Sequence, residues 1–505
     1  MHNGQQVILV LDKKHMALLF ISLFFIIIGS RAAVINYSGS FTPFLDEWDG
    51  DAAGLLKPYI TADLTIRDLF SPFNEHIILF TRLLVLAILH IYGYWDVILQ
   101  MVVNAVLDAV TIVGISYALS RVLGGAWAVA LMVISTLINA IPLSYDSILM
   151  AFNTHFYLLL AFSFASLWYL ADSRAWSPRW AVGVLCAVAS FLCMASGALT
   201  LAAAIGLHVS QTACGRRGGP WEWLGIAALA AATFTLTSLV PHVAESDPYT
   251  AHSLREFLSK LLELATWPAA PIFGWLIVLP SALFCLRTLA DCPALTDPRW
   301  YNVAAFGWIL TQFLALAAGR AGMPIVNRYF DTLLIGVAIN LTSIFWLLGS
   351  QPIGGQRKLW RRLALAAWLV LVAASLARSE RHLPEYLSHR RQTAEVQAQN
   401  LRSYLATGDA LYLTSAPGVE KIPYPVSSRL RELLDTSEIR AVLSPELLSR
   451  DTPQNFVEAF KRNFLRLSFM WLGLGVLLLI ATVASAALTP VRPRANGFEG
   501  PAALR

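Results

Sequence analysis

Long apolar runs are the feature that most constrains this chain. Only 14% of its 505 residues are charged, whereas a soluble protein has about 25%. Crossing a bilayer as a helix takes about 20 mostly apolar residues, and twelve runs are predicted to do so: 15–36, 95–120, 125–143, 156–172, 180–194, 196–211, 222–240, 269–290, 300–318, 331–349, 363–378 and 466–488. The sequence therefore predicts an all-α polytopic membrane protein.

Two of these assignments depend on the loop charges. Residues 77–92 are apolar but short and include Arg82, so they are predicted to form a surface or re-entrant helix. Residues 181–209 are too long for one helix and are interrupted at Ser196-Gly197, which predicts two short spans. With these choices the arginine-rich loops face the cytoplasm, as the positive-inside rule requires.

The same rule places the two ends and the soluble part of the chain. The N-terminus is predicted to be cytoplasmic, in a bacterial inner (plasma) membrane, and a signal peptide ending near Ala33 is the alternative for the first apolar run. Residues 1–378 then form the transmembrane module, 379–465 a small periplasmic domain, and 466–505 the last span and tail. Within 379–465 the pattern predicts helices at 390–405, 428–434 and 452–464 and a strand at 409–414.

An acidic cluster follows the first span. Asp46, Glu47, Asp49 and Asp51 place four carboxylates in six residues, and each would cost roughly 3 kcal/mol in hydrocarbon. The cluster must therefore lie at the outer membrane surface, as a general base, a metal site or a cation path. A shifted pKa is expected for Asp46, at the membrane lip among like charges, whereas Asp51 is expected to be solvated.

Other polar residues collect on the predicted outer side. Two arginines in the segment 319–329 break the positive-inside trend, and arginine makes bidentate bonds to phosphate; lipid headgroups or the acidic cluster are the alternative partners. The charges of the amphipathic segment 253–265, including Lys260, are expected to form a solvated face. The outer residues predicted to bind a substrate are Trp48, His76, Arg82, Asp146, Asn153, His155, Arg320, Arg328 and Tyr329.

The order of these features resembles the GT-C superfamily of integral membrane glycosyltransferases. The resemblance rests on four features: the pair Asp46-Glu47 directly after the first span, the surface helix 76–92, the break at Ser196-Gly197 and the outer loop 241–268. The pair is similar to that of protein O-mannosyltransferases and of the transferase that adds aminoarabinose to lipid A. The resemblance covers residues 10–350. Ser196 stands where some relatives have a basic residue, and the Asp-x-Asp of oligosaccharyltransferases has no clear counterpart.

This resemblance implies transfer of a sugar from a polyprenyl-phosphate donor to a lipid, glycan or protein acceptor on the periplasmic face. Asp46 would be the general base, with Glu47 or Asp49 orienting it or binding acceptor hydroxyls. Arg82, Arg320 or Arg328 would stabilise the leaving phosphate, and Trp48 would stack on a sugar. No cofactor is certain, although Mg²⁺ or Mn²⁺ at the acidic cluster stays open. The net charge of +5 gives no nucleic-acid signal.

The competing function is a transporter or flippase for lipid-linked saccharides, and a structural subunit with a degenerate transferase fold is a third reading. A transporter usually carries ionisable groups near the bilayer midplane. Here Asp108 is the only acid in mid-span, and it is expected to bond to neighbouring helices. The discriminating feature is a cavity open to lipid: the transferase hypothesis requires that Asp46, His76 and Arg328 line one such cavity.

Overall fold

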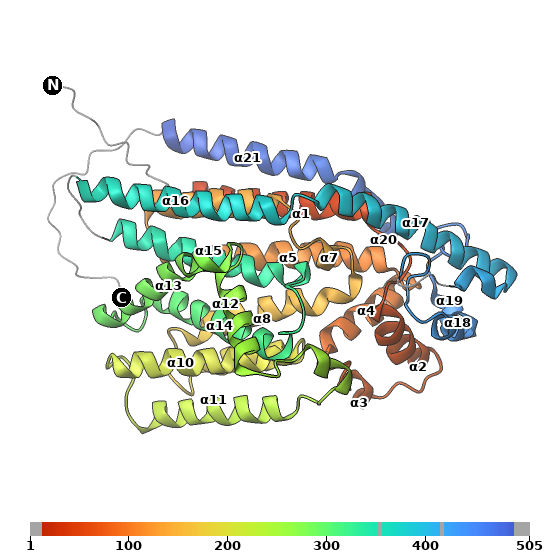
Figure 1. The fold of residues 1–505 in the computed structure, drawn as a ribbon, viewed down its shortest axis with the longest axis horizontal. Coiled ribbons are helices and arrows are strands. Elements are labelled where there is room, and N and C mark those ends of the chain that lie inside the picture. The colour runs from red at the N-terminus through yellow and green to blue at the C-terminus, as the bar shows by residue number, and fades with distance from the viewer. Residues whose placement is uncertain (1–12, 351–355, 415–418, 489–505) are drawn as a thin grey trace.

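The computed structural model describes residues 13–350, 356–414 and 419–488, and all regular structure in these residues is helical (Figure 1). The first half of the chain forms α1 (Lys13–Ser38), the π-helix η1 (Glu47–Leu56), α2 (Lys57–Ile60), α3 (Ile66–Leu69), α4 (Leu79–Tyr92), α5 (Val97–Ser120), α6 (Gly125–Ala140), α7 (Tyr145–Ile148), η2 (Ala151–Asn153), α8 (Thr154–Leu170), α9 (Pro178–Phe191), η3 (Ala195–Ala198), α10 (Leu199–Ala213), α11 (Pro220–Ser238) and η4 (Ala244–Tyr249).

The second half begins with the amphipathic α12 (Leu254–Thr266). The remaining elements are α13 (Pro271–Asp291), α14 (Arg299–Gly319), η5 (Asn327–Tyr329), α15 (Phe330–Gly349), α16 (Gln356–Ser379), α17 (Leu383–Thr407), η6 (Ala410–Leu413), α18 (Ser427–Asp435), α19 (Ser437–Val442), α20 (Phe456–Arg466) and α21 (Ser468–Leu488). All twelve predicted spans fall on helices. The elements η2 to η6 are short 3₁₀ turns.

Seven helical segments in the described residues are long and apolar enough to cross a membrane: Lys13–Ser38, Val97–Ser120, Pro271–Asp291, Arg299–Gly319, Asn327–Gly349, Leu359–Thr407 and Ser468–Ala486. The other five predicted spans correspond to α6, α8, α9, α10 and α11. Of these, α6, α8, α9 and α10 have 14 to 17 residues, fewer than the about 20 that a perpendicular span needs. The membrane character is thus supported, and the number twelve stays a prediction.

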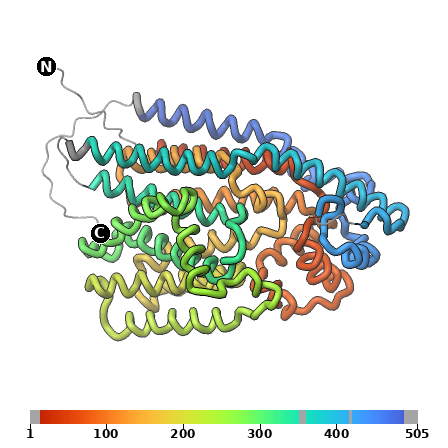
Figure 2. Tube along the Cα trace, viewed as in Figure 1, coloured from red at the N-terminus to blue at the C-terminus, as the bar shows by residue number. Residues whose placement is uncertain are grey.

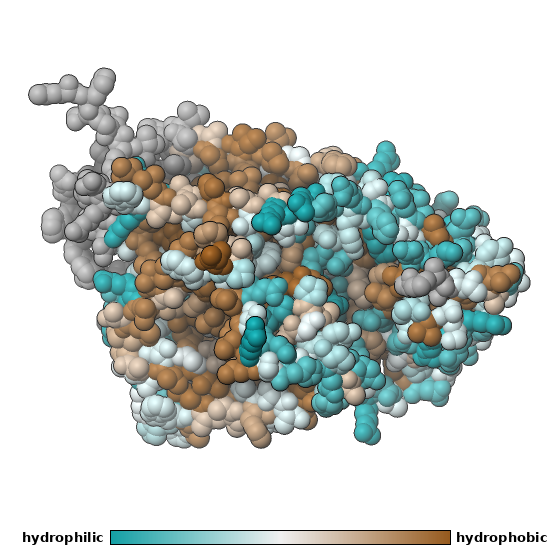
Figure 3. All heavy atoms as spheres, in the orientation of Figure 1, coloured by the Kyte–Doolittle hydropathy of each residue, from teal (hydrophilic) through white to brown (hydrophobic). Residues whose placement is uncertain are grey.

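The molecule has an apolar end and a polar end. The spans run roughly parallel, whereas α2, α3 and α4 gather with α17 to α20 at one end (Figures 1 and 2). Hydrophobic surface covers the helices at the left of Figure 3, and hydrophilic side chains collect at the right. The elements at the polar end belong to the loops that the sequence predicts to be outside.

The predicted break at Ser196-Gly197 is confirmed. Helix α9 ends at Phe191, a short 3₁₀ turn follows, and α10 begins at Leu199. A Cβ on Gly197 would lie 2.3 Å from the carbonyl group of Ser190, so any larger residue would push the turn away from α9. The turn is bonded on both sides: the Ser196 carbonyl accepts from Gln312 of α14 at 3.2 Å, and the Ala195 amide donates to His76 at 3.4 Å.

The predicted strand at 409–414 is wrong, because this segment forms the 3₁₀ turn η6. Asp409 precedes the turn, and its carboxylate accepts from the Leu411 amide at 2.9 Å. Such a cap satisfies a free amide of a helical turn, and the alternating apolar pattern finds no strand to pair with among the described residues. The three helices predicted nearby correspond to α17, α18 and α20.

The segment 379–465 shares a hydrophobic core with the first outer loop. Trp48 and Trp95 meet edge to face, with ring centroids 5.6 Å apart, in a cluster that also contains Leu401 and Leu430. The backbones are joined as well, because the Trp95 amide donates to the Val442 carbonyl at 2.7 Å. The C-terminal outer segment therefore packs directly on the acidic cluster.

A buried ion pair joins three of the helices. Arg31 of α1 donates to Asp108 of α5 at 3.0 Å and to the Asn139 carbonyl at the end of α6 at 3.0 Å. Both charged side chains are almost fully buried. The expectation that Asp108 bonds to a neighbouring helix is confirmed.

Breaking this pair should be more harmful than removing it. Asp108→Leu leaves the Arg31 guanidinium buried without its carboxylate, and we expect a loss of about 3–5 kcal/mol of stability. The double variant Arg31→Leu/Asp108→Leu should recover most of that loss. Thermal unfolding of the purified protein in detergent measures both. Glu395→Leu, which removes an exposed pair with Arg391, is the control and should change little; a double variant no better than Asp108→Leu contradicts the expectation.

Candidate functional site

A polar cavity of about 370 Å³ lies among the loops that the sequence predicts to be outside. It is walled by the start of η1, the turn at 73–78, the start of α8, the η4 region and the segment 320–329. The predicted site residues that line it are Asp46, His76, Asn153, His155, Arg320, Arg328 and Tyr329. Sequence positions up to 283 residues apart, from Asp46 to Tyr329, thus meet in one place.

An apolar cavity of about 310 Å³ adjoins the polar one. Leu159, Leu199, Val240 and Leu316 belong to its lining, which comes from α8, α10, α11 and α14. The two cavities share six wall residues: Glu75, His76, Phe156, Met194, Arg320 and Tyr329. Asp46, His76 and Arg328 therefore lie in one cavity, and that cavity borders an apolar one between helices.

Asp46 is held at the cavity wall by a strained turn. Leu45 has a φ of 49°, in the left-handed region that costs free energy for a bulky residue such as leucine. Its amide donates to the Pro423 carbonyl at 2.9 Å, and its carbonyl accepts from the Trp48 amide at 3.0 Å. Burial raises the pKa of Asp46, the Arg328 charge lowers it, and Asp49 raises it further. Burial dominates, so Asp46 is a stronger base than a solvated aspartate.

Glu47 does not reach the cavity. Its side chain is fully buried, and its two carboxyl oxygens accept from the Phe44 amide at 2.7 Å and the Phe152 amide at 3.2 Å. Burial raises the pKa of Glu47 to about 7 against these hydrogen bonds. Glu47 therefore ties the first outer loop to the second, and the expectation that it binds acceptor hydroxyls is wrong.

Trp48 is also a core residue. It is fully buried, and its indole N–H donates to the Pro43 carbonyl at 2.8 Å. A ring with both faces covered leaves no surface for a sugar, so the predicted stacking role is wrong. The acidic neighbours of Trp48 suggest an exposed tryptophan, but the C-terminal segment packs over the ring and buries it.

The other two acids of the cluster point elsewhere. Asp49 is half-buried and bonds to Arg429 at 3.1 Å and to the Tyr424 hydroxyl. Burial, together with that bond, raises the pKa of Tyr424 to about 12. Asp51 was expected to be solvated, yet it is fully buried and neither carboxyl oxygen has a hydrogen-bond partner in the described residues. Burial and the Glu47 charge therefore raise its pKa well above the usual range.

This divergence does not suit a metal ion at the cluster. A divalent cation such as Mg²⁺ needs several oxygens converging on one point, whereas only Asp46 of these four lines the cavity. Within the described ranges, no group of three or more His, Cys, Asp or Glu side chains is placed to hold a metal ion. The cluster as folded does not fit the Mg²⁺ or Mn²⁺ that the sequence left open.

Arg82 and Asp146 lie outside the cavity lining. Arg82 donates through one nitrogen to three backbone carbonyls, those of Asp68, Leu69 and Ser71. It therefore closes the turn before α4, and its predicted contact with a leaving phosphate is wrong. Asp146 accepts from the Tyr386 hydroxyl at 2.5 Å, which connects the second outer loop to α17.

Two histidines meet at the cavity wall, with ring centroids 6.3 Å apart. Burial lowers the pKa of His76, so its ring is neutral near pH 7. Since the Ala195 amide donates to Nδ1 of His76, the ring proton belongs on Nε2, which makes that nitrogen a donor. His155 bonds through Nδ1 to the Phe152 carbonyl at 2.9 Å.

Arg320 and Arg328, the two arginines that break the positive-inside trend, have different surroundings. Arg320 pairs with Glu75 at 3.1 Å, and Glu75 also accepts from the Ser246 hydroxyl. Arg328 has a buried Nε that finds no hydrogen-bond partner in the part of the chain that the structure describes. Arg328 is therefore the better placed of the two to receive an anion. Glu75 was not predicted as a site residue, although its place beside His76 in the sequence was a signal.

Lys260 ties the loop 241–268 to the segment 320–329. Its ammonium group donates to Glu263 at 2.6 Å and to the Met323 carbonyl at 2.6 Å, and the side chain is buried. The expectation of a solvated face is wrong for this residue, because α12 packs one side against the segment 320–329. Val243, Glu245, Ser246 and Tyr249, which precede α12, line the polar cavity.

The comparisons with known proteins give no match: no family model, curated protein or solved structure is similar to this chain at a significant level. The likeness to the GT-C superfamily thus rests on the Asp46-Glu47 pair and the order of the segments. The chemistry of the cavity must carry any functional conclusion.

Glu47 makes stability depend on pH. Its pKa is raised from 4.5 to about 7 in the folded protein, so its stabilising effect is complete below about pH 4.5 and is lost as the pH rises to 7. The loss amounts to roughly 3 kcal/mol. We expect Glu47→Gln, which stays neutral, to flatten this decline in thermal unfolding between pH 4.5 and 8. The exposed Glu420→Gln is the control, and equal slopes for the two variants would contradict the assignment.

Proposed function

We propose that this protein is a membrane glycosyltransferase that moves a sugar from a polyprenyl-phosphate donor to a hydroxyl acceptor on the outer face of a bacterial inner membrane. One observation carries the proposal: a cavity with a carboxylate base and arginines shares a wall with an apolar cavity between helices. A lipid-linked sugar needs both, a polar chamber for sugar and phosphate and an apolar one for the prenyl chain.

The residues of the polar cavity suit the steps of glycosyl transfer. Asp46 removes the proton of the acceptor hydroxyl as its oxygen bonds to the anomeric carbon of the sugar. The bond between that carbon and the phosphate oxygen breaks, and the bonding electrons leave with the polyprenyl phosphate. Arg328 binds the phosphate and stabilises its growing charge. The raised pKa of Asp46 makes it a better base for this task.

Neighbouring groups complete the site, either by contacting the substrate or by fixing the loop that carries Asp46. Arg320, held by Glu75, lies on the wall common to both cavities, where the phosphate of a lipid-linked donor would sit. Neutral His76 supplies a donor for a sugar or phosphate oxygen. Glu47 and the contacts of Asp49 to Tyr424 and Arg429 fix the loop that carries Asp46.

The polar groups within the spans argue against the transporter alternative. Asp108 is paired with Arg31, Asn104 bonds to the Ala151 carbonyl at 2.9 Å, and Asn340 accepts from the Ser281 amide at 3.2 Å. A translocation path would keep such groups available to a passing substrate. Here they hold helices together.

Asp46→Asn tests the base directly. Without a proton acceptor, turnover of a radiolabelled polyprenyl-phosphate sugar in reconstituted vesicles should fall by about 10²- to 10⁴-fold. Asp63→Asn changes an exposed acid of the same outer loop and should leave turnover unchanged. Turnover by Asp46→Asn equal to that of Asp63→Asn would remove Asp46 as the base.

A bulky residue in the apolar cavity tests the seat of the prenyl chain. Ala315 lines this cavity, whereas Ala318, on the same helix, does not. We expect Ala315→Trp to raise the KM for a full-length polyprenyl donor about tenfold and to leave a short-chain donor nearly unaffected. Ala318→Trp is the matched control. An equal effect on long and short donors would show that the chain binds elsewhere.

A further inference from the structure

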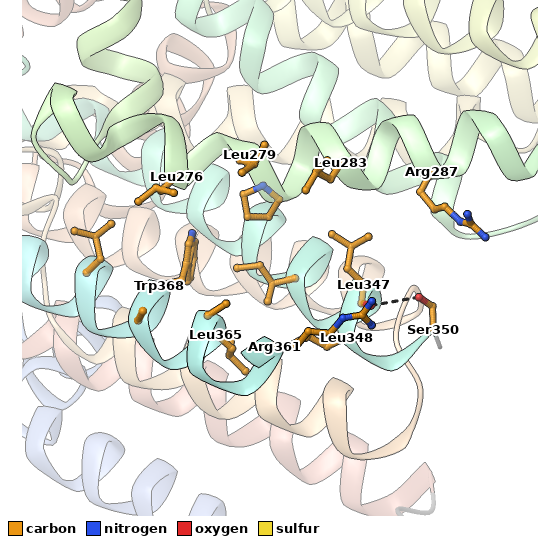
Figure 4. A pocket seen from close by; sticks show the side chains of 15 residues that line it. Leu276, Leu279, Leu283, Arg287, Leu347, Leu348, Ser350, Arg361, Leu365 and Trp368 are labelled. Atoms are coloured by element: carbon orange, nitrogen blue, oxygen red, sulfur yellow. Dashed lines mark hydrogen bonds between the residues drawn. The ribbon is translucent and has the colours of Figure 1, made fainter. Parts of the chain in front are cut away.

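A second lipid-sized groove lies on another part of the molecule, between α13, α15 and α16. Its volume is about 560 Å³, and its lining is apolar apart from one end. Leu276, Leu279 and Leu283 form one side, and Leu365 and Trp368 face them from α16 (Figure 4). None of its lining residues belongs to the polar cavity or to the apolar cavity beside it.

The polar end of the groove carries two arginines. Arg287 on α13 and Arg361 on α16 lie there together with Ser350 (Figure 4). Arg287 has a carboxylate partner, Asp291, at 3.1 Å. The Arg361 guanidinium is hydrogen-bonded to Ser350 (Figure 4), but its Nη1 is buried and has no hydrogen-bond partner within the described residues. A buried donor without an acceptor is unfavourable, so this end is suited to an added anion.

The length and direction of the groove indicate what kind of molecule it can bind. From Leu276 to Arg287 the helix rises about 16 Å at 1.5 Å per residue, which is about half of the 30 Å hydrocarbon core. Loop charges predict that the arginine end is cytoplasmic, and anionic lipids give the cytoplasmic leaflet its negative surface. The groove therefore matches one leaflet and one acyl chain with a phosphate at its polar end.

We propose that this groove is a binding site for an anionic phospholipid of the inner leaflet. The phosphate lies between Arg287 and Arg361, and an acyl chain runs along the leucines toward Trp368. The site is independent of the proposed transferase activity, since it shares no lining residue with the polar cavity or with the apolar cavity beside it.

Native mass spectrometry of the full-length, delipidated protein tests the site. Phosphatidylglycerol and phosphatidylcholine serve as probes. The wild type should retain one phosphatidylglycerol more tightly than it retains phosphatidylcholine. Arg361→Gln should weaken that binding about fivefold or more. Arg362→Gln is the matched control, because Arg362 is the next residue but is exposed and does not line the groove.

A groove-filling variant separates the chain from the headgroup. Ala364→Trp fills the groove and should reduce retention, whereas Ala366→Trp, an exposed alanine of the same helix outside the lining, should not. Inorganic phosphate should fail to displace the lipid. Equal retention of the two lipids, or equal binding by Arg361→Gln and Arg362→Gln, would overturn the proposal, and so would displacement of the lipid by phosphate.

Discussion

The outer site depends on one buried carboxyl group, that of Glu47. It accepts two backbone amides, from Phe44 before it and from Phe152 in the second outer loop. Since Asp46 is the adjacent residue, and Asn153 and His155 follow Phe152 closely, these two bonds bring both segments to the same cavity. A surface acid makes such a pairing poorly, because water competes for the amides. Burial removes this competition from water and so strengthens the two hydrogen bonds. It also raises the pKa of Glu47 to about 7.

The C-terminal outer segment completes this arrangement from the other side. Tyr424 and Arg429 bond to Asp49, the Pro423 carbonyl accepts from Leu45, and Tyr386 donates to Asp146. Arg390 lies with its guanidinium 3.9 Å from the centre of the Phe44 ring. These contacts hold the loop in the strained conformation that presents Asp46. The segment therefore acts on the site as a clamp, although its own composition suggests no activity.

Much of the architecture could be predicted from hydropathy and charge. The long apolar runs predict the long apolar helices that the structure contains, and the break at Ser196-Gly197 is visible as two small residues in an otherwise apolar stretch. The site residues were predicted with mixed success. Asp46, His76, Arg320 and Arg328 were recognisable because each is a polar residue in a loop that the sequence predicts to lie at the membrane surface. The predictions for Trp48, Asp51 and Lys260 were wrong because their burial comes from segments distant in sequence, which no local pattern reveals.

The sequence by itself determined that the chain is helical, rich in segments apolar enough to span a membrane and acidic just after the first of them, because these properties follow from local composition and periodicity. Only the tertiary structure decided which acid of the cluster meets a cavity. Four neighbouring carboxylates are alike in sequence, but their surroundings differ: Glu47 and Asp51 are buried in a core, Asp49 is held by a tyrosine and an arginine, and Asp46 faces the space shared with Arg328. The direction of a side chain depends on packing with distant elements.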